Sequence, residues 1–189
     1  MRVSRRSSAV LNNMNKTKFP VARVRQILAQ ARRMRVVVVG DAMLDHFIWG
    51  SVGRISPEAP VPVVDFERES FMPGGAANVA RNLTSLRAPT ELLGAVGRDS
   101  AASQLKRLLN DYHIGCRGLL GNARRNTTVK TRIVAQKQQV VRIDRETRDG
   151  LGHGLTQRLV AEVQALIGNT AAVIVGDYGK GVVTQPLLD

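Results

Sequence analysis

Cysteine and histidine are scarce in this sequence, and their scarcity excludes several kinds of site. The only cysteine among the 189 residues is Cys116, so the chain can form neither an internal disulfide nor a cysteine-rich zinc site. The three histidines, His46, His113 and His153, stand far apart, which gives a zinc cluster little support, and we predict no metal ligands. Such sparing use of cysteine is typical of the reducing cytosol, so we expect a cytoplasmic protein.

Long hydrophobic runs are missing as well. No stretch approaches the roughly 18 apolar residues that a membrane-spanning helix needs, and no secretory hydrophobic segment is present. We therefore expect no membrane partner. The length of 189 residues suits one domain with a substantial core.

Acidic residues are absent from the first 35 residues, which carry most of the excess positive charge. Residues 1–35 contain ten Lys or Arg residues, so the net charge of +13 leaves only +3 for the remainder of the chain. This basic extension has a single aromatic residue, Phe19, and offers no platform on which nucleic-acid bases could stack. We therefore expect no specific nucleic-acid partner, and at most weak, salt-sensitive binding.

The start of this extension has two interpretations. Residues 1–13 are rich in Arg and Ser and lack acids, as a transit peptide would be. Met14 begins a second plausible start, so a reading frame that extends too far upstream is an equal alternative. Residues 24–32 then show the apolar spacing of an amphipathic helix.

Strand-like and helix-like segments alternate along the rest of the chain. The run Arg35–Gly40 holds four consecutive valines and ends in glycine, which is typical of a strand buried on both faces of a parallel sheet. Such alternation predicts an α/β fold with a doubly wound sheet. Further strands are expected at 91–96, 114–120 and 171–175, and helices at 74–86, at 155–167 and after a cap at Asp99 or Ser100.

Two segments depart from this alternation. Val61–Glu67 is expected to be an edge strand because prolines flank and interrupt it. Residues 127–134 and 139–144 have the pattern of a hairpin in which charged residues alternate along both strands. We expect these strands, at about 61–68 and 127–144, to form a small accessory sheet that stands off the main layer.

Several charged residues are candidates for binding a ligand. Asp41 and Asp45 follow the first strand, where a carboxylate can accept hydrogen bonds from two sugar hydroxyls or simply cap a helix. Asp177 and Lys180 bracket a glycine-rich loop after a buried strand, which is a stronger functional context. Cations on or beside the hairpin could meet a phosphate, although an exposed charged strand is more often a solvated edge. These cations are Lys130, Arg132, Arg142 and Arg145.

The most informative motif is the turn at Gly74 and Gly75, which precedes an apolar helical segment carrying Asn78. Glycine permits positive φ and lets a ligand approach the backbone closely, and the first helical turn adds unpaired N–H groups. Asn78 offers both a donor and an acceptor. The turn therefore suits a hydroxylated or anionic small molecule, or else it serves only tight packing.

Two common nucleotide-binding motifs are not matched. The loop 176–181 lacks the G-x-x-x-x-G-K-[ST] spacing, because Val182 stands where that motif needs lysine. The segment 74–78 is not G-x-G-x-x-G either, so a dinucleotide fingerprint is missing.

Together these motifs resemble the ribokinase-like (PfkB) family of carbohydrate kinases. The segment Gly74–Ala80, followed by Gly97, is similar to the first signature of that family. The run Arg54–Val63, with Ile-Ser-Pro-Glu-Ala-Pro-Val-Pro, narrows the resemblance. With Gly40–Asp45 and Asp177–Gly181, the pattern looks like the kinase domain of the heptose-7-phosphate kinase/ADP-heptose synthases, from about residue 36 to the last residue.

The resemblance implies ATP-dependent phosphorylation of D-glycero-β-D-manno-heptose 7-phosphate at O1, for the ADP-heptose of lipopolysaccharide core, with ATP and Mg²⁺ as cofactors. It implies that Asp45 holds sugar hydroxyls, that Gly74, Gly75 and Asn78 line the sugar site, and that Asp177 lies near substrate and metal. The accessory strands would form a lid and the interface of a homodimer. From their charge we add cations to this site, with Arg142 in contact with substrate and Lys130, Arg132 and Lys180 as phosphate ligands.

The chain departs from the family pattern in two respects. Arg87 stands where the signature has Gly or Ser, so the turn after that helix must be made differently. The Gly-Ala-Gly-Asp motif, with the family's general base and anion hole, and the metal-associated Asn-x-x-Glu motif do not occur in the sequence. We therefore expect no catalytic residue in this chain, and interpret residues 36–189 as the N-terminal portion of a kinase domain truncated in its C-terminal half. A non-catalytic sugar-phosphate-binding or dimerisation module is the alternative.

Overall fold

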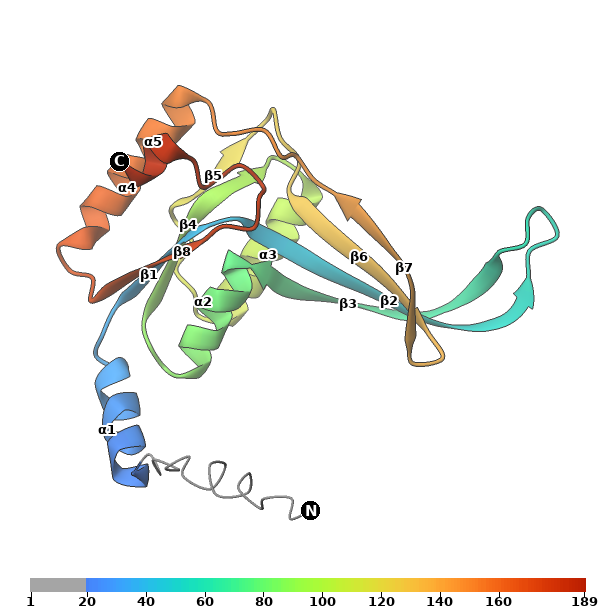
Figure 1. Cartoon of the computed structure of the whole chain (residues 1–189), viewed down its shortest axis with the longest axis horizontal. Helices are drawn as coiled ribbons and strands as arrows, with labels where there is room; N and C mark the ends of the chain where they lie inside the picture. Colours follow the sequence, from blue (N-terminus) through green and yellow to red (C-terminus); the bar gives the residue numbers. More distant parts are fainter. Residues whose placement is uncertain (1–19) are drawn as a thin grey trace, which may run out of the picture.

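Two four-stranded sheets, which meet at Asp41, form the framework of the protein (Figure 1). The computed structural model describes residues 20–189. The basic tail up to residue 19, including the two alternatives for residues 1–13, lies outside the described residues.

The first sheet is parallel throughout, in the order β5-β4-β1-β8. Its strands are β1 (Val36–Gly40), β4 (Thr90–Gly97), β5 (Leu119–Asn122) and β8 (Ala172–Gly176). The four valines of β1 are buried because this strand lies in the middle of the sheet with helices on both faces. Helices α2 (Ala76–Ser85) and α3 (Ser100–Asp111) cover one face, and α4 (His153–Ile167) and α5 (Gln185–Leu188) cover the other. The predicted doubly wound α/β fold is thus confirmed.

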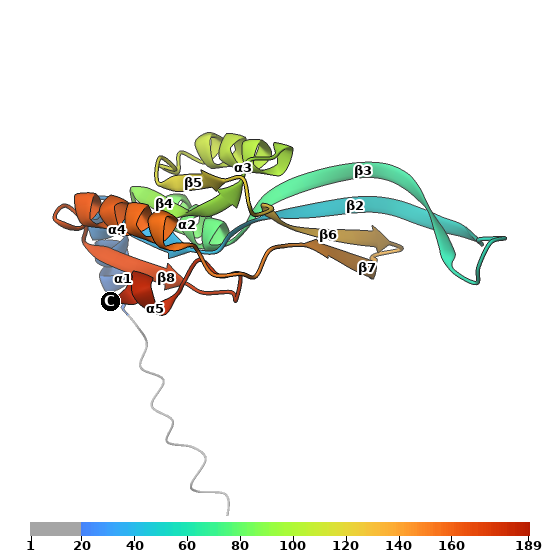
Figure 2. The same ribbon diagram turned by 90° about the horizontal axis from the view of Figure 1, so that it is seen from above.

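The second sheet, called the lid sheet below, projects from the parallel sheet (Figure 2). Its strands are β2 (Ala42–Ile55), β3 (Pro62–Gly75), β6 (Thr128–Ala135) and β7 (Gln138–Arg145), in the order β3-β2-β6-β7. The hairpin β6–β7 agrees with the sequence prediction, and its two turn residues, Gln136 and Lys137, have positive φ. The proline-flanked strand is present too, but it runs on to Gly75.

Strand β2 was missed by sequence analysis, which placed Asp45 after the first strand and predicted no second strand there. The residue lies inside this 14-residue strand instead. Apolar side chains occur on both faces, with Leu44 and Ile48 alternating with Phe47 and Trp49, so the sequence lacks the polar–apolar alternation of a half-buried strand. A strand that is apolar on both sides carries no periodic signal.

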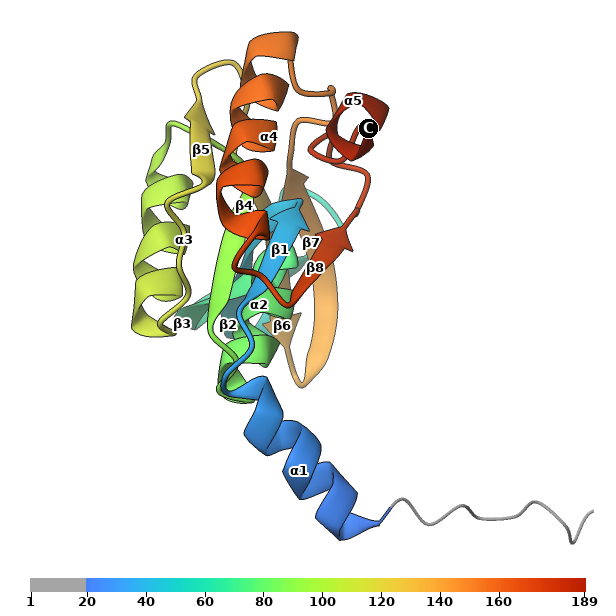
Figure 3. The ribbon, with the colours of Figure 1, turned by 90° about the vertical axis from the view of Figure 1, so that its left-hand side faces the viewer.

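Three other elements differ from expectation in their extent. The strand expected at 114–120 is reduced to β5 with one isolated bridge between Gly115 and Glu91. The expected helix 74–86 begins at Ala76, because both glycines complete β3. Helix α1 (Val21–Ala31), expected at 24–32, begins three residues earlier; it buries no residue and stands away from both sheets (Figure 3). No helix within residues 20–189 has the length and apolar character to cross a membrane.

Arg87 makes the turn after α2 in a left-handed conformation, with φ of 64°. Its N–H group donates to the Thr84 carbonyl, and that of Ala88 donates to the Leu83 carbonyl, which closes the helix end. Arg87 thus adopts the backbone geometry for which glycine is usually selected.

Asp99 caps α3 and fixes the start of β6 to it. One carboxylate oxygen accepts hydrogen bonds from the Ala102 N–H (2.9 Å) and the Thr127 hydroxyl (2.7 Å), and the other from the Thr127 N–H (3.0 Å). Burial by itself raises the pKa of Asp99, but these hydrogen bonds outweigh it and hold the pKa below its ordinary value.

We expect Asp99→Ala to lower the free energy of unfolding by about 1–2 kcal/mol at pH 7, the cost of a lost N-cap. Urea unfolding should show the loss, with Asp111→Ala, exposed at the other end of α3, as the matched control. Because the folded-state pKa is lowered, the stabilisation should be full at neutral pH and should disappear as the pH falls below the ordinary Asp value of about 3.9. Equal stability of the two variants would contradict this role.

Candidate functional site

A cavity of about 240 Å³ lies where the lid sheet meets the carboxyl ends of β1 and β8. We call it the hinge pocket. Ligands of doubly wound sheets bind at the carboxyl ends of the parallel strands, so its position is that of a binding site. Its walls are Met43, Asp45, Gly75, Lys130, Arg132, Tyr178 and Lys180. Five of the nine residues predicted from the sequence are therefore brought together.

Gly74 and Gly75 are required because two segments of the chain pass very close to each other at the edge of the hinge pocket. A Cβ on Gly74 would lie 2.6 Å from Oδ2 of Asp45, so any larger residue would displace that carboxylate. Gly75 has φ of 55°, and a Cβ there would collide with the Asp41 carbonyl oxygen. Next along the chain, the Ala76 N–H donates to that carbonyl, which anchors the start of α2.

Each cation of the lid sheet that lines the pocket is held by a carboxylate. Arg132 Nη1 lies 2.7 Å from Asp45 Oδ1, with the guanidinium over the ring of Phe47. Lys130 Nζ lies 3.4 Å from Asp144 Oδ2. These pairs restrict the positions of the cations before any ligand arrives.

The charge of the pocket wall is positive. Three cations and one carboxylate line it, a formal excess of two positive charges. Such an excess matches the charge of a phosphate monoester near neutral pH. The carboxylate of Asp45 can accept hydroxyl donors beside it, so the pocket can hold a hydroxylated phosphate ester.

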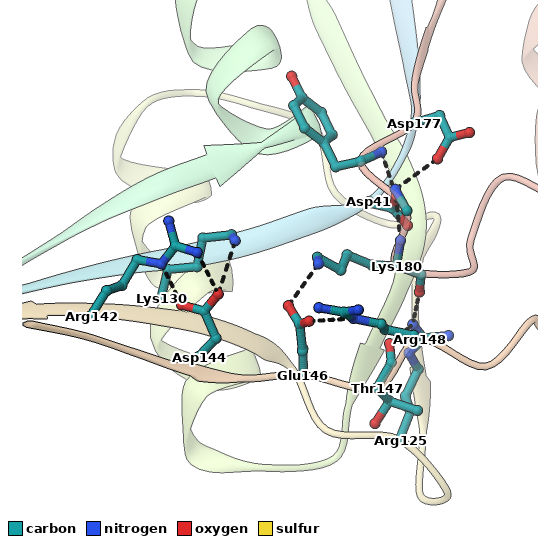
Figure 4. A network of polar contacts seen from close by, with 12 residues as sticks. Asp41, Arg125, Lys130, Arg142, Asp144, Glu146, Thr147, Arg148, Asp177 and Lys180 are labelled. Atoms are coloured by element: carbon teal, nitrogen blue, oxygen red, sulfur yellow. Dashed lines mark hydrogen bonds and ion pairs between the residues drawn. The ribbon is translucent and has the colours of Figure 1, made fainter.

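Four predicted residues do not line the pocket. Arg142 is 47% exposed and binds Asp144 on its own strand through Nε at 2.8 Å. Asp177 is exposed, and its carboxylate accepts the Gly179 N–H at 2.9 Å within the loop (Figure 4). Asn78 is exposed on α2. Gly74 contributes by leaving space for Asp45 rather than by lining the pocket.

Asp41 has a structural role in place of the sugar-binding role considered for it. Its buried carboxylate accepts hydrogen bonds from three backbone N–H groups, of Tyr178 (2.8 Å), Lys180 (3.1 Å) and Val182 (3.1 Å). The carboxylate therefore fixes the loop after β8, which supplies Tyr178 and Lys180 to the pocket.

Sequence reasoning missed two charged residues behind the pocket, Glu146 and Arg125 (Figure 4). Glu146 Oε2 lies 2.7 Å from Lys180 Nζ, and Arg125 donates to the Lys180 carbonyl at 2.6 Å. Hydrogen bonds from Lys180 and then Arg148 lower the pKa of Glu146, and burial lowers the pKa of Arg125. In the sequence, both stand in charged segments that look like solvated surface, so no pattern marks them.

No part of residues 20–189 assembles a metal site, since no three His, Cys, Asp or Glu side chains gather closely enough. None of these residues is assigned to a Mg²⁺ ion accompanying ATP.

A larger cavity, of about 490 Å³, lies on the opposite face of the lid sheet against α3. Leu44 and His46 line it, and side chains alternate along β2, so it opens away from Asp45. Of the candidate ligands named from the sequence, only Arg145 lines it. The hinge pocket is therefore the better candidate for the predicted chemistry.

Comparison with known proteins gives matches to one family. The family model described as pfkB family carbohydrate kinase matches residues 33–185. "Bifunctional protein HldE" of Paramagnetospirillum magneticum is 42% identical over 156 residues, which cover 82% of this chain and 32% of that protein. The protein of the same name from Helicobacter pylori strain P12 is 45% identical over 148 residues, covering 78% and 32%. The chain thus spans about a third of the length of these curated relatives.

Solved structures show the same fold at low sequence identity. Phosphofructokinase-2 of Escherichia coli, in a tetrameric inhibited form, superposes with a TM-score of 0.60 at 19% identity, covering 79% of this chain and 47% of that one. Arabidopsis thaliana ribokinase, complexed with ribose and ATP, gives 0.53 at 16% identity, covering 75% and 45%. The ribokinase-like fold is therefore shared, over less than half of each of these chains.

If Asp41 organises the loop, Asp41→Ala should free the amides of Tyr178, Lys180 and Val182. We expect hydrogen exchange at these amides to accelerate by at least roughly tenfold, because each loses its buried acceptor. Asp177→Ala, which removes only the contact to Gly179, is the matched control in the same loop. Unchanged protection in Asp41→Ala would show that other contacts hold the loop.

Proposed function

The chain belongs to the pfkB family of carbohydrate kinases, and we propose that its residues form the acceptor side of a heptose-7-phosphate kinase site. The acceptor would be D-glycero-β-D-manno-heptose 7-phosphate, phosphorylated at O1 with ATP as donor, in the cytoplasm and toward ADP-heptose for lipopolysaccharide core. The observation that carries the proposal is the lining of the hinge pocket. The carboxylate of Asp45, which can accept hydrogen bonds from hydroxyl groups, lies there beside three cations.

Within this proposal, different residues of the pocket bind different groups of the acceptor. Asp45 accepts hydrogen bonds from sugar hydroxyls, and the Arg132 pair holds its carboxylate toward the pocket. Lys130, Arg132 and Lys180 bind the 7-phosphate, for which their excess charge is suited. Gly74 and Gly75 keep the wall open for the ligand. Among the outlying residues, Asn78 and Asp177 stay proposals by resemblance, and Arg142 stays a proposal from its charge; we propose that all three approach the sugar when it is bound.

The donor side of the reaction is proposed to come from residues outside this sequence. ATP supplies the phosphoryl group and Mg²⁺ offsets its charge in such reactions. The family's Gly-Ala-Gly-Asp and Asn-x-x-Glu motifs do not occur among the 189 residues, and the described carboxylates do not gather into a metal site. Without a partner for these functions, the chain would act as a sugar-phosphate-binding module, which is the second candidate and is favoured by the same pocket.

We further propose that the lid sheet forms a homodimer interface. Large apolar side chains are exposed along it, including Phe66 on β3 and both Val141 and Ile143 on β7. Val141 and Ile143 share one face of the hairpin, so they form an apolar surface that a second lid sheet would cover.

Sedimentation velocity should therefore show a dimer that Val141→Asp combined with Ile143→Asp converts to a monomer, because two charges would be buried at the interface. Leu86→Asp, exposed at the end of α2, is the control and should stay dimeric. A monomeric wild-type chain, or a dimer that survives both lid substitutions, would rule this interface out.

For the acceptor site, we expect Asp45→Asn to weaken binding of heptose 7-phosphate by roughly tenfold in calorimetry, the scale of one hydrogen bond to a charged group. Binding of the unphosphorylated heptose should be weakened to a similar extent, because Asp45 is proposed to contact hydroxyl groups. Asp65→Asn, an exposed carboxylate on β3, is the matched control. Unaltered affinity in Asp45→Asn, or no binding by the wild type, would refute the assignment.

A further inference from the structure

We propose that Glu146 is a positioning residue, which holds the ammonium group of Lys180 at the wall of the hinge pocket for binding the phosphate of the acceptor. The inference rests on the proposed function and extends it to a residue that makes no contact with the pocket space itself. Glu146 follows the last residue of β7, whereas Lys180 lies in the loop after β8. The pair thus links the lid sheet to the parallel sheet.

The backbone of Lys180 is fixed on both sides. Its N–H group donates to Asp41 Oδ2 at 3.1 Å, and its carbonyl accepts from Arg125 Nη2 at 2.6 Å. A lysine side chain has four rotatable bonds beyond this backbone, so an anchored backbone alone does not place the ammonium group. The remaining anchor is Glu146, whose Oε2 lies 2.7 Å from Lys180 Nζ. The side chains of Lys180 and Glu146 are 11% and 10% exposed, respectively.

The ammonium group keeps the capacity to bind a ligand while it is paired. Nζ carries three N–H donors, and the ion pair with Glu146 at 2.7 Å engages at most one of them. Since Lys180 lines the pocket and Glu146 does not, the other donors are available on the pocket side. The second oxygen of Glu146 is held by Arg148 Nε at 2.6 Å, which keeps the carboxylate itself in place.

Glu146 is not needed merely to hold the two segments together, because neighbouring contacts already do so. Arg125 bridges the two segments, donating to the Thr147 carbonyl at 3.4 Å and to the Lys180 carbonyl at 2.6 Å. The Leu151 N–H donates to the Gly181 carbonyl at 3.1 Å. The distinct contribution of the Glu146 carboxylate is therefore the placement of a buried cation.

A double-mutant cycle tests this inference, with calorimetric titration of heptose 7-phosphate and of unphosphorylated heptose. Glu146→Gln keeps the side-chain size and removes the charge, and Lys180→Met removes the cation. We expect Glu146→Gln to weaken the binding of heptose 7-phosphate by roughly tenfold. The affinity for the unphosphorylated heptose should stay within about twofold of wild type, because only the phosphate contacts Lys180. In the Lys180→Met background, Glu146→Gln should cause no further loss, since it acts through the missing ammonium group. Glu67→Gln, an exposed glutamate on β3, is the control.

The outcomes separate this inference from the proposed function. A wild-type chain that binds no heptose 7-phosphate refutes the proposed function, and this inference with it. A wild-type chain that binds, with Glu146→Gln binding equally well or more tightly, refutes the inference alone. Equal weakening of both sugars, or additive losses in the double variant, would assign Glu146 a purely structural role and refute it as well.

Discussion

One buried carboxylate, that of Asp41, makes the contacts on which the rest of the structure depends. It occupies the single position between β1 and β2, where the chain passes from the parallel sheet to the lid sheet. Its side chain accepts three N–H groups of the loop after β8, and its carbonyl accepts the first N–H of α2. Because a buried charge is tolerated only when it is hydrogen-bonded, the loop, the helix and the lid sheet are fixed relative to one another at this point.

The hinge pocket follows from this junction, since the lid sheet and the loop each supply part of its wall. Lys130 and Arg132 come from β6, and Lys180 comes from the loop that Asp41 holds. Each of the three cations is paired with a carboxylate, so their positions are restricted before a ligand binds. A site ordered in advance loses less conformational entropy on binding, which favours affinity for a small anionic ligand.

Sequence analysis correctly predicted the elements whose structure is determined by residues close together in the sequence. Four consecutive valines identified β1, and the pair Asp99 and Ser100 located the cap of α3, which is Asp99. Strand β2 was missed because both of its faces are apolar. Sequence analysis could not predict which charged residues form pairs across the fold. Arg142 has the same charge as Arg132 and lies opposite it in the hairpin, yet its guanidinium binds Asp144 on its own strand. Glu146 gave no signal because its burial depends on Lys180, 34 positions further along.

Our central proposal is that this chain carries the acceptor half of a sugar kinase site while the donor half lies elsewhere. A phosphorus-31 NMR titration of heptose 7-phosphate with purified residues 1–189, in the presence of ATP and Mg²⁺, addresses both parts at once. We predict that the 7-phosphate resonance shifts with saturation as protein is added and that no sugar 1-phosphate resonance grows in. An unperturbed 7-phosphate resonance, or accumulation of the bisphosphate, would contradict the claim.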